Sequence, residues 1–213
     1  MIEIKHKETG KVLLRIEANT LSGQFLEGAQ LAGAKLAGQD LRNTDLQRAD
    51  LRAADLTGCN LTDAMLLGVI MSGAVCDGAD FTRADLTDVM AKGVSFRHCK
   101  FSKANLRYAK LDESDFTDAD LVSADISSAK LGCNFTRADL SRADMRGADL
   151  AGAVLTSACL IEADLSEASI SKADLKGALL ERAKIGHGQR LGAHVFKTAK
   201  ENPIRPWWMF WAS

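Results

Sequence analysis

The chain has 213 residues, 46% of them hydrophobic, and its 27 basic and 28 acidic residues leave a formal net charge of −1. This balance excludes the strongly basic surface that attracts nucleic acid. No apolar run approaches the roughly 20 residues that a membrane-spanning helix requires, so we expect neither nucleic acid nor a membrane as a partner. A chain of this length and composition is typical of one soluble domain, which we expect in the cytoplasm.

Residues 1–17 predict a two-stranded β-hairpin. A turn signal at residues 8–11 separates two short stretches in which apolar and polar residues alternate, with the apolar positions at Ile2, Ile4, Val12, Leu14 and Ile16. Alternation with a period of two is typical of strands that bury one face. The charges among these residues do not fit a signal peptide, so we expect the hairpin to cap the structure that follows.

Residues 24–187 form a tandem array with a five-residue period. Large apolar residues recur from Leu26 to Leu131 and again from Phe135 to Ile185, giving 33 units whose centres include 21 Leu, 5 Phe, 3 Ile and 2 Met. The residue two positions before a centre is almost always small, and it is Ala in 23 units. So regular a period predicts a solenoid.

A five-residue period fits neither a helix nor a flat sheet. On an α-helix each step of five rotates the apolar residue by roughly 140°, so no single apolar stripe forms. In a continuous strand an odd step sends successive apolar residues to opposite faces. The period therefore predicts that the chain turns a corner in every unit, with the large and the small residue pointing into one narrow core.

The units resemble those of a known family. Residues 49–53 read Ala-Asp-Leu-Arg-Ala, residues 54–58 read Ala-Asp-Leu-Thr-Gly, and residues 119–123 read Ala-Asp-Leu-Val-Ser. This Ala-(Asp/Asn)-Leu pattern is similar to that of the pentapeptide-repeat family. The resemblance implies an all-β fold, a right-handed quadrilateral β-helix with four units in each coil. We therefore expect about eight coils, stacked at the strand spacing of about 4.8 Å.

Four units per coil would place residues that are four units apart on top of each other. Phe81 is then expected to stack on Phe101, and Phe96 on Phe116, so that bulky rings gather on two neighbouring sides of the core. Smaller centres in the same stretch, Cys76 and Ala91, would compensate for the volume of the rings.

The array has one fault, because the step from Leu131 to Phe135 is four residues long where the other steps are five. The missing residue falls at a corner. We expect a tightened turn there, with Gly132 supplying backbone angles that other residues avoid.

The cysteines indicate no metal site. Four of them occupy inward positions, either as the small residue or as a centre: Cys59, Cys76, Cys99 and Cys133. The fifth, Cys159, falls on an outward position. We expect buried, reduced thiols with a structural role.

The carboxylates and histidines indicate no catalytic site and no cofactor. Asp precedes the centre in 14 units, and a basic residue often follows within three positions, as in Asp50 and Arg52. A feature that recurs along the whole array is typical of a solvated, turn-stabilising surface; a calcium site on stacked carboxylates is the alternative. The histidines form no cluster with Ser or Cys, and no phosphate-binding loop is present.

One break in the polar surface predicts a partner-binding patch. In three successive units the residue before the centre is apolar, and two further apolar residues belong to the same stretch, giving the set Met65, Leu67, Ile70, Val75 and Met90. Contiguous exposed apolar area marks an interface on many soluble proteins. The alternative is that scattered apolar residues are tolerated or are covered by a terminal segment.

Residues 188–213 predict a short helix over 189–202 followed by an aromatic tail. The segment contains five bulky aromatic residues, Phe196, Trp207, Trp208, Phe210 and Trp211. Such rings gain from leaving water. The family resemblance implies dimerisation through the C-terminal end; the alternatives are capping of the chain's own last coil and anchoring at a membrane interface.

These patterns predict a non-enzymatic protein-interaction scaffold with an unknown protein partner. The alternative comes from the resemblance, because some pentapeptide-repeat proteins protect DNA gyrase by imitating duplex DNA. A DNA mimic requires uncompensated negative charge. The near balance of basic and acidic residues in this chain favours the scaffold.

Overall fold

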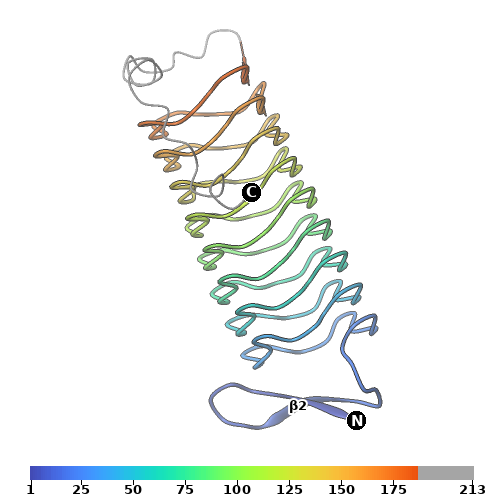
Figure 1. The fold of residues 1–213 in the computed structure, drawn as a ribbon. Coiled ribbons are helices and arrows are strands. Elements are labelled where there is room, and N and C mark those ends of the chain that lie inside the picture. Colours follow the sequence, from blue (N-terminus) through green and yellow to red (C-terminus); the bar gives the residue numbers. More distant parts are fainter. Residues whose placement is uncertain (187–213) are drawn as a thin grey trace, which may run out of the picture.

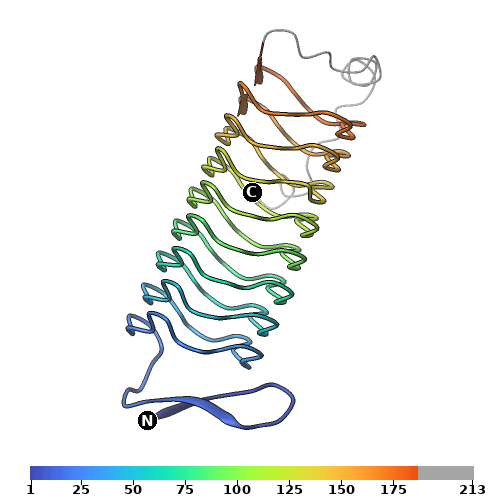
Figure 2. The same ribbon diagram turned by 180° about the vertical axis from the view of Figure 1, so that it is seen from behind.

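A computed structural model describes residues 1–186 of the chain; residues 187–213 lie outside the described part, and with them the helix expected over 189–202 and the aromatic tail. Strands β1 (Ile2–Lys5) and β2 (Val12–Ile16) form the N-terminal hairpin, while β3 (Asp164–Leu165) and β4 (Lys184–Ile185) pair near the other end. Between them lies a stack of coils in chain order (Figures 1 and 2).

The expected N-terminal hairpin is confirmed, and it covers the first coil. The antiparallel register pairs Ile2 with Ile16, and the hairpin continues into the rod through two hydrogen bonds of 2.8 Å, from the Lys7 N–H to the Gly33 carbonyl and from the Lys35 N–H to the Lys5 carbonyl. The His6 ring lies so close to Gly33 that a Cβ there would come within 2.4 Å of Nε2. Glycine at that turn therefore lets the cap approach the coil.

Parallel β-bridges join each unit to the unit one coil away and define four columns, one for each side of the rod. Each column contains one residue from every coil, the residue that immediately precedes a centre on that side of the rod. We name the first two columns side A and side B. Side A comprises Phe25, Asp45, Met65, Asp85, Asn105, Asp125, Asp144, Asp164 and Lys184. Side B comprises Gln30, Asp50, Ile70, Met90, Lys110, Lys130, Asp149 and Ser169.

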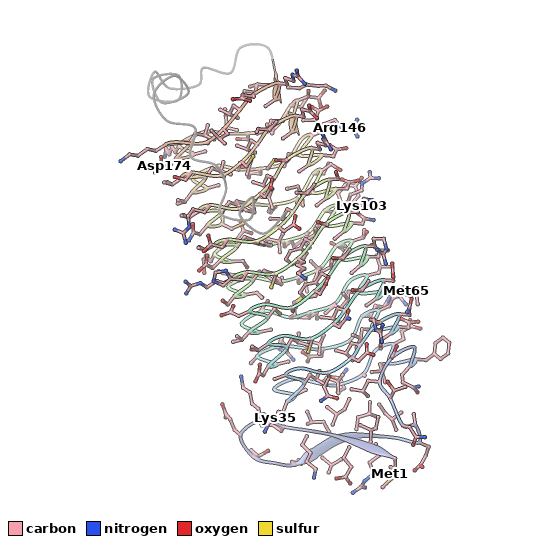
Figure 3. All side chains as sticks on the ribbon, viewed as in Figure 1. Met1, Lys35, Met65, Lys103, Arg146 and Asp174 are labelled. Atoms are coloured by element: carbon pink, nitrogen blue, oxygen red, sulfur yellow. The ribbon has the colours of Figure 1, made fainter. Side chains whose placement is uncertain are left out.

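The remaining two columns follow in chain order, so side A lies opposite side C and side B opposite side D. Figure 3 shows this opposition: Met65 of side A lies on one edge of the rod, and Lys35 and Asp174 of side C lie on the other. Side C comprises Lys35, Asp55, Val75, Ser95, Asp115, Asn134, Val154 and Asp174. Side D comprises Asp40, Asn60, Asp80, Lys100, Asp120, Asp139, Cys159 and Leu179.

Hydrogen bonding explains why Asp so often precedes the large apolar centre of a unit. In residues 120–124 the N–H of Asp120 donates to the coil below, and the N–H groups of Leu121 and Ser123 donate to the coil above, over 2.7–2.9 Å. The N–H of Ala124 closes the turn onto the Leu121 carbonyl at 3.0 Å. Only the N–H of Val122 lacks a backbone acceptor, and it donates to Asp120 Oδ1 at 3.0 Å. The aspartate therefore completes the hydrogen bonding of its own unit.

The corners are type II turns. The second residue after each centre has a positive φ, between 53° and 73°, in every described unit except the one with the fault. Twenty of these residues are not glycine, for example Ala53 and Tyr108. Because this region costs an L-residue about 1–2 kcal/mol, the turns are held in place by the stacking of the coils around them.

The core is one side chain wide, as expected. The centres from Leu31 to Leu160 are at most 1% exposed. Both expected ring stacks are confirmed, with centroids 4.8 Å apart for Phe81 and Phe101 and for Phe96 and Phe116. Phe135 extends the second stack at 5.0 Å from Phe116, so the side C core contains three rings in successive coils.

The fault at residues 131–135 is absorbed within one corner. The Cys133 N–H donates to the Leu131 carbonyl at 2.7 Å, a tighter turn than any neighbour makes. The predicted role of Gly132 is wrong, since its φ is not positive. With one residue fewer, the corner omits the left-handed position entirely. The bridges across the fault join residues 19 apart, as in Asp115 with Asn134, and later bridges join residues 20 apart again.

Candidate interaction surface

The outward aspartates serve the backbone. All 14 aspartates that precede a centre accept a hydrogen bond from the N–H two residues ahead, and Asn60, Asn105 and Asn134 do the same. Carboxylates that resemble acid/base pairs in the sequence are therefore parts of the turns. Their even distribution along the rod follows from the repeat.

Arginines neutralise many of these carboxylates. Arg52 contacts Asp50 with Nη2 2.6 Å from Oδ2, and its guanidinium holds the pKa of that carboxyl below its usual value. Other pairs join successive coils, as where Arg83 donates two hydrogen bonds of 2.6 and 2.7 Å to Asp63. Such exposed pairs contribute little stability each, but together they remove uncompensated charge from the surface.

The thiols are buried. All five cysteines are free and lie in the interior. Burial raises the pKa of the Cys59 thiol to about 11 and that of Cys99 to about 12. The expectation that Cys159 points outward is wrong as regards exposure, because only 7% of the residue is accessible and its Sγ lies 3.1 Å from the Ser141 hydroxyl of the coil below. Thiols in this state are poor nucleophiles and poor metal ligands.

No chemistry-bearing cluster emerges from the described residues. Within residues 1–186 no group of three or more His, Cys, Asp or Glu side chains could hold a metal ion. One pocket, which the sequence did not reveal, lies at the corner between sides C and D. Its wall contains Asp118, whose carboxylate accepts two hydrogen bonds of 2.6 and 2.7 Å from Arg137 and lies 3.9 Å from His98 Nδ1. These partners hold the pKa of Asp118 below its usual value.

The structure separates the residues of the expected apolar patch. Met65 lies on side A, Ile70 and Met90 form a bridged pair on side B, and Val75 lies on side C, opposite Met65. Leu67 lies on the turn between sides A and B. Exposure is 39% for Met65, 38% for Val75 and 36% for Met90. Only Ile70 and Met90, with Leu67 at their edge, therefore belong to one surface.

The surroundings of this pair are smooth. Ile70 is flanked by turns that carry Gly68 and Gly73, whereas Met90 is flanked by turns that carry Asp88 and Gly93. A Cβ built at Gly73 or Gly93 would meet nothing within 4 Å. Asp50 precedes the pair on side B, and Lys110 follows it. Side B is therefore a low apolar strip with an acidic residue at one end and a basic residue at the other.

The repeat that builds these surfaces matches one family. The family described as pentapeptide repeats (8 copies) matches residues 26–63, 59–97, 99–132, 133–171 and 148–186. The chain is a pentapeptide-repeat protein. Membership implies the right-handed quadrilateral β-helix that the sequence predicted, in agreement with the four bridge columns.

Solved pentapeptide-repeat structures are similar to this protein at low identity. HetL from the cyanobacterium Nostoc sp. strain PCC 7120, described as involved in heterocyst differentiation regulation, shares 27% identity over 82% of this chain and 94% of its own, with a TM-score of 0.39. QnrB1, described as a plasmid-mediated fluoroquinolone resistance protein, shares 22% over 79% and 90%, with a TM-score of 0.43. No curated protein sequence matches this pentapeptide-repeat protein significantly.

Two further expectations concern the ends of this pentapeptide-repeat protein. The aromatic tail, with Phe196, Trp207, Trp208, Phe210 and Trp211, lies outside the described residues and stays a prediction. In residues 1–186 there is no helix long and apolar enough to cross a membrane.

Proposed function

We propose that this pentapeptide-repeat protein is a non-enzymatic scaffold of about eight coils that presents four different sides to a protein partner. The observation that carries the proposal is the hydrogen bonding of the unit. Because coils bond to each other's backbone groups, and in 14 units an aspartate accepts from a remaining N–H, the backbone beneath the outward side chains is held in a fixed position. A surface prepared in this way lowers the entropy cost of binding.

The state of the polar groups supports a non-enzymatic role. A catalytic carboxylate or thiol needs a pKa matched to proton transfer or nucleophilic attack. The aspartates before the centres are engaged in turns, and burial raises the pKa of the Cys59 and Cys99 thiols. The five free cysteines also support a reducing compartment such as the cytoplasm.

The charge arrangement supports the scaffold over a DNA mimic. The longest acidic run on side A comprises Asp125, Asp144 and Asp164. Each of them has a cationic neighbour, with Arg146 2.6 Å from Asp144 and Lys184 3.3 Å from Asp164. A mimic of the phosphate backbone would leave such a run uncompensated.

Photocrosslinking from each side tests the proposal. A benzophenone amino acid is placed at one exposed position per side, namely Met65, Met90, Val154 or Lys100, and the protein is irradiated in cells of its source. A scaffold yields one protein adduct that appears from one or two sides only. Adducts that are the same from all four sides, or none, would contradict the proposal. In parallel, protection of purified gyrase from a quinolone would establish the DNA-mimic alternative.

A further inference from the structure

The order of residues along side B is unlike that of the other sides. From the N-terminal end it reads Gln30, Asp50, Ile70, Met90, Lys110 and Lys130. An apolar pair therefore lies at the middle of this segment. Asp50, which is 8% exposed and ion-paired with Arg52, lies on one flank, and Lys110, which lies 3.7 Å from Asp88, begins the basic flank on the other. If the same series of residues is laid against itself in the opposite direction, the apolar pair meets the apolar pair and the acidic end meets the basic end.

Reversal is what a twofold axis produces when two rods lie side by side in opposite directions. If the axis crosses side B between Ile70 and Met90, Ile70 faces Met90 of the second copy, and the reverse contact forms by symmetry. Asp50 then faces Lys110 of the second copy, again twice. We propose that two copies of this protein associate antiparallel through side B.

The edges of side B agree with this arrangement. An antiparallel twofold contact keeps each edge of the side against the same edge of the second copy. On the edge formed by the turns after side B, Arg52 faces Asp112 of the second copy. On the other edge, Arg48, which pairs with Glu27 of its own chain, faces the ring of Tyr108, which is 51% exposed. Arg107 already lies 5.3 Å from the centroid of this ring, so a cation–π contact with Arg48 would need the opposite face of the ring.

The glycine turns let the two copies approach. The turn at Gly73 faces the turn at Gly93 of the second copy, and at these two positions no Cβ holds the rods apart. Lys92, which precedes Gly93 and pairs with Glu113, faces Ser72. At these two turns the backbones of the two copies can therefore approach closely.

Other arrangements place like charges or mismatched residues together. A parallel contact through side B would set Lys110 of one copy against Lys110 of the other. An antiparallel contact centred on Met65 of side A would set Asp45 against Asp85, and on side C the axis between Val75 and Ser95 would set Asp55 against Asp115. Moving the axis on side B by half a coil in either direction places an apolar residue against a charge.

The contact is small, so the association is weak. Six coil levels stacked at 4.8 Å give a strip about 24 Å long, and five extended residues span at most about 16 Å. The projected area is thus about 400 Å² per copy, roughly half of the area that standard interfaces bury on each partner. We expect dimers at high-micromolar concentration of the full chain.

A charge reversal with a matched control tests the geometry. Lys110→Glu replaces the two contacts between Asp50 and Lys110 by two contacts between carboxylates. We expect the dimer dissociation constant of the full chain, measured by sedimentation equilibrium, to rise about tenfold or more. Lys100→Glu on side D is the control, because Lys100 has a similarly long ion pair, 3.8 Å to Asp80 against 3.7 Å from Lys110 to Asp88. An equal effect of the two variants would overturn the proposal.

The apolar contact has its own matched pair. Met90→Asp should abolish the dimer, and Val154→Asp on side C should leave it intact, although the two residues are equally exposed at 36% and 37%. Thermal melts of both variants serve as the check that they fold. Side B would be refuted as the interface by a chain that stays monomeric at about 500 µM. It would also be refuted by a dimer that survives Met90→Asp, and that second result would indicate dimerisation through the C-terminal segment.

Complementation by mixing separates the specific arrangement from a general loss of stability. Arg52→Glu and Asp112→Lys each create like-charge contacts in their own homodimer. In a mixture, the carboxylate introduced at position 52 of one copy meets the ammonium introduced at position 112 of the other. The remaining native pair reforms as well, so heterodimers should form with clearly higher affinity than either homodimer, although Asp50 of the Arg52→Glu copy has lost its own ion-pair partner. If the mixture stays as monomeric as its components, the antiparallel register is wrong.

Discussion

The stacked phenylalanines provide the most direct test of the core. Phe101 is fully buried, and its ring centroid lies 4.8 Å from that of Phe81, 5.3 Å from that of Phe96 and 5.5 Å from that of Phe116. Phe101→Ala removes a ring that contacts two sides and three coils. Because the neighbouring backbone is held by coil-to-coil hydrogen bonds, the cavity cannot collapse.

The expected loss of stability follows from these contacts. A buried Phe→Ala change that leaves its cavity open costs about 3–5 kcal/mol. For a chain of this size each kcal/mol lowers the melting temperature by about 2–4 °C, so we expect a decrease of about 6–20 °C. Phe101→Leu introduces the residue that already serves as the centre in 21 units and should cost only about 1–2 kcal/mol, mainly for the lost ring contacts.

Thermal melts of the two variants, followed by circular dichroism and checked by urea denaturation, measure the difference. A continuous ring core requires that Phe101→Ala destabilise the protein clearly more than Phe101→Leu does. If the unfolding free energies of both variants lie within about 1 kcal/mol of the wild type, the rings do not form a continuous core.

Leu121→Asp should abolish folding, because it buries an unpaired charge, whereas Asp120→Ala removes the acceptor of the Val122 N–H and of the Ser102 hydroxyl and should cost only about 1–2 kcal/mol; equal melting temperatures would contradict the assignment of inward and outward positions. Ala53→Gly should stabilise the rod by about 0.5–1 kcal/mol, since Ala53 has a φ of 53°, while Ala37→Gly on a turn position without positive φ should destabilise it; urea midpoints of the two variants decide. The pKa of Asp118 is lowered by the arginine beside it, so its contribution is present above about pH 4 and is lost as the pH falls through the lowered pKa; unfolding curves between neutral and acidic pH should show a shallower acid decline for Asp118→Asn, and an unchanged decline would refute this role.

The core was predictable because it depends on spacing alone. A period of five requires a corner in every unit, and the inward positions and the buried centres follow from that requirement. The stack of Phe81 on Phe101 needs, in addition, the four units per coil that the family resemblance implies. The hairpin of residues 1–17 was predictable for the same reason, since alternation of apolar residues specifies a strand with one buried face. Both predictions use the period and need no knowledge of particular contacts.

The surface was harder to predict because neighbours in sequence are not neighbours on the rod. Met65, Ile70 and Val75 belong to successive units, and successive units lie on successive sides, so they could not form one patch. The pocket beside Asp118 depends on side chains that approach across coils, such as Arg137, and no sequence pattern marks it. The burial of Cys159 depends on the Ser141 hydroxyl of another coil and was equally hidden.

The shortened corner at residues 131–135 shows that the side on which a residue lies is determined by the number of units that precede it, and not by the exact number of residues. One residue was lost there, yet every later unit remains in its column, because the loss fell inside a turn. A deletion of one whole unit would behave differently: it would move every following residue to the preceding side and scatter the residues that now share side B. Loss or duplication of a complete coil would leave all four sides in phase. The length of such a protein can therefore change during evolution by whole coils with its surfaces preserved, and changes by single units create new surfaces from an unchanged core.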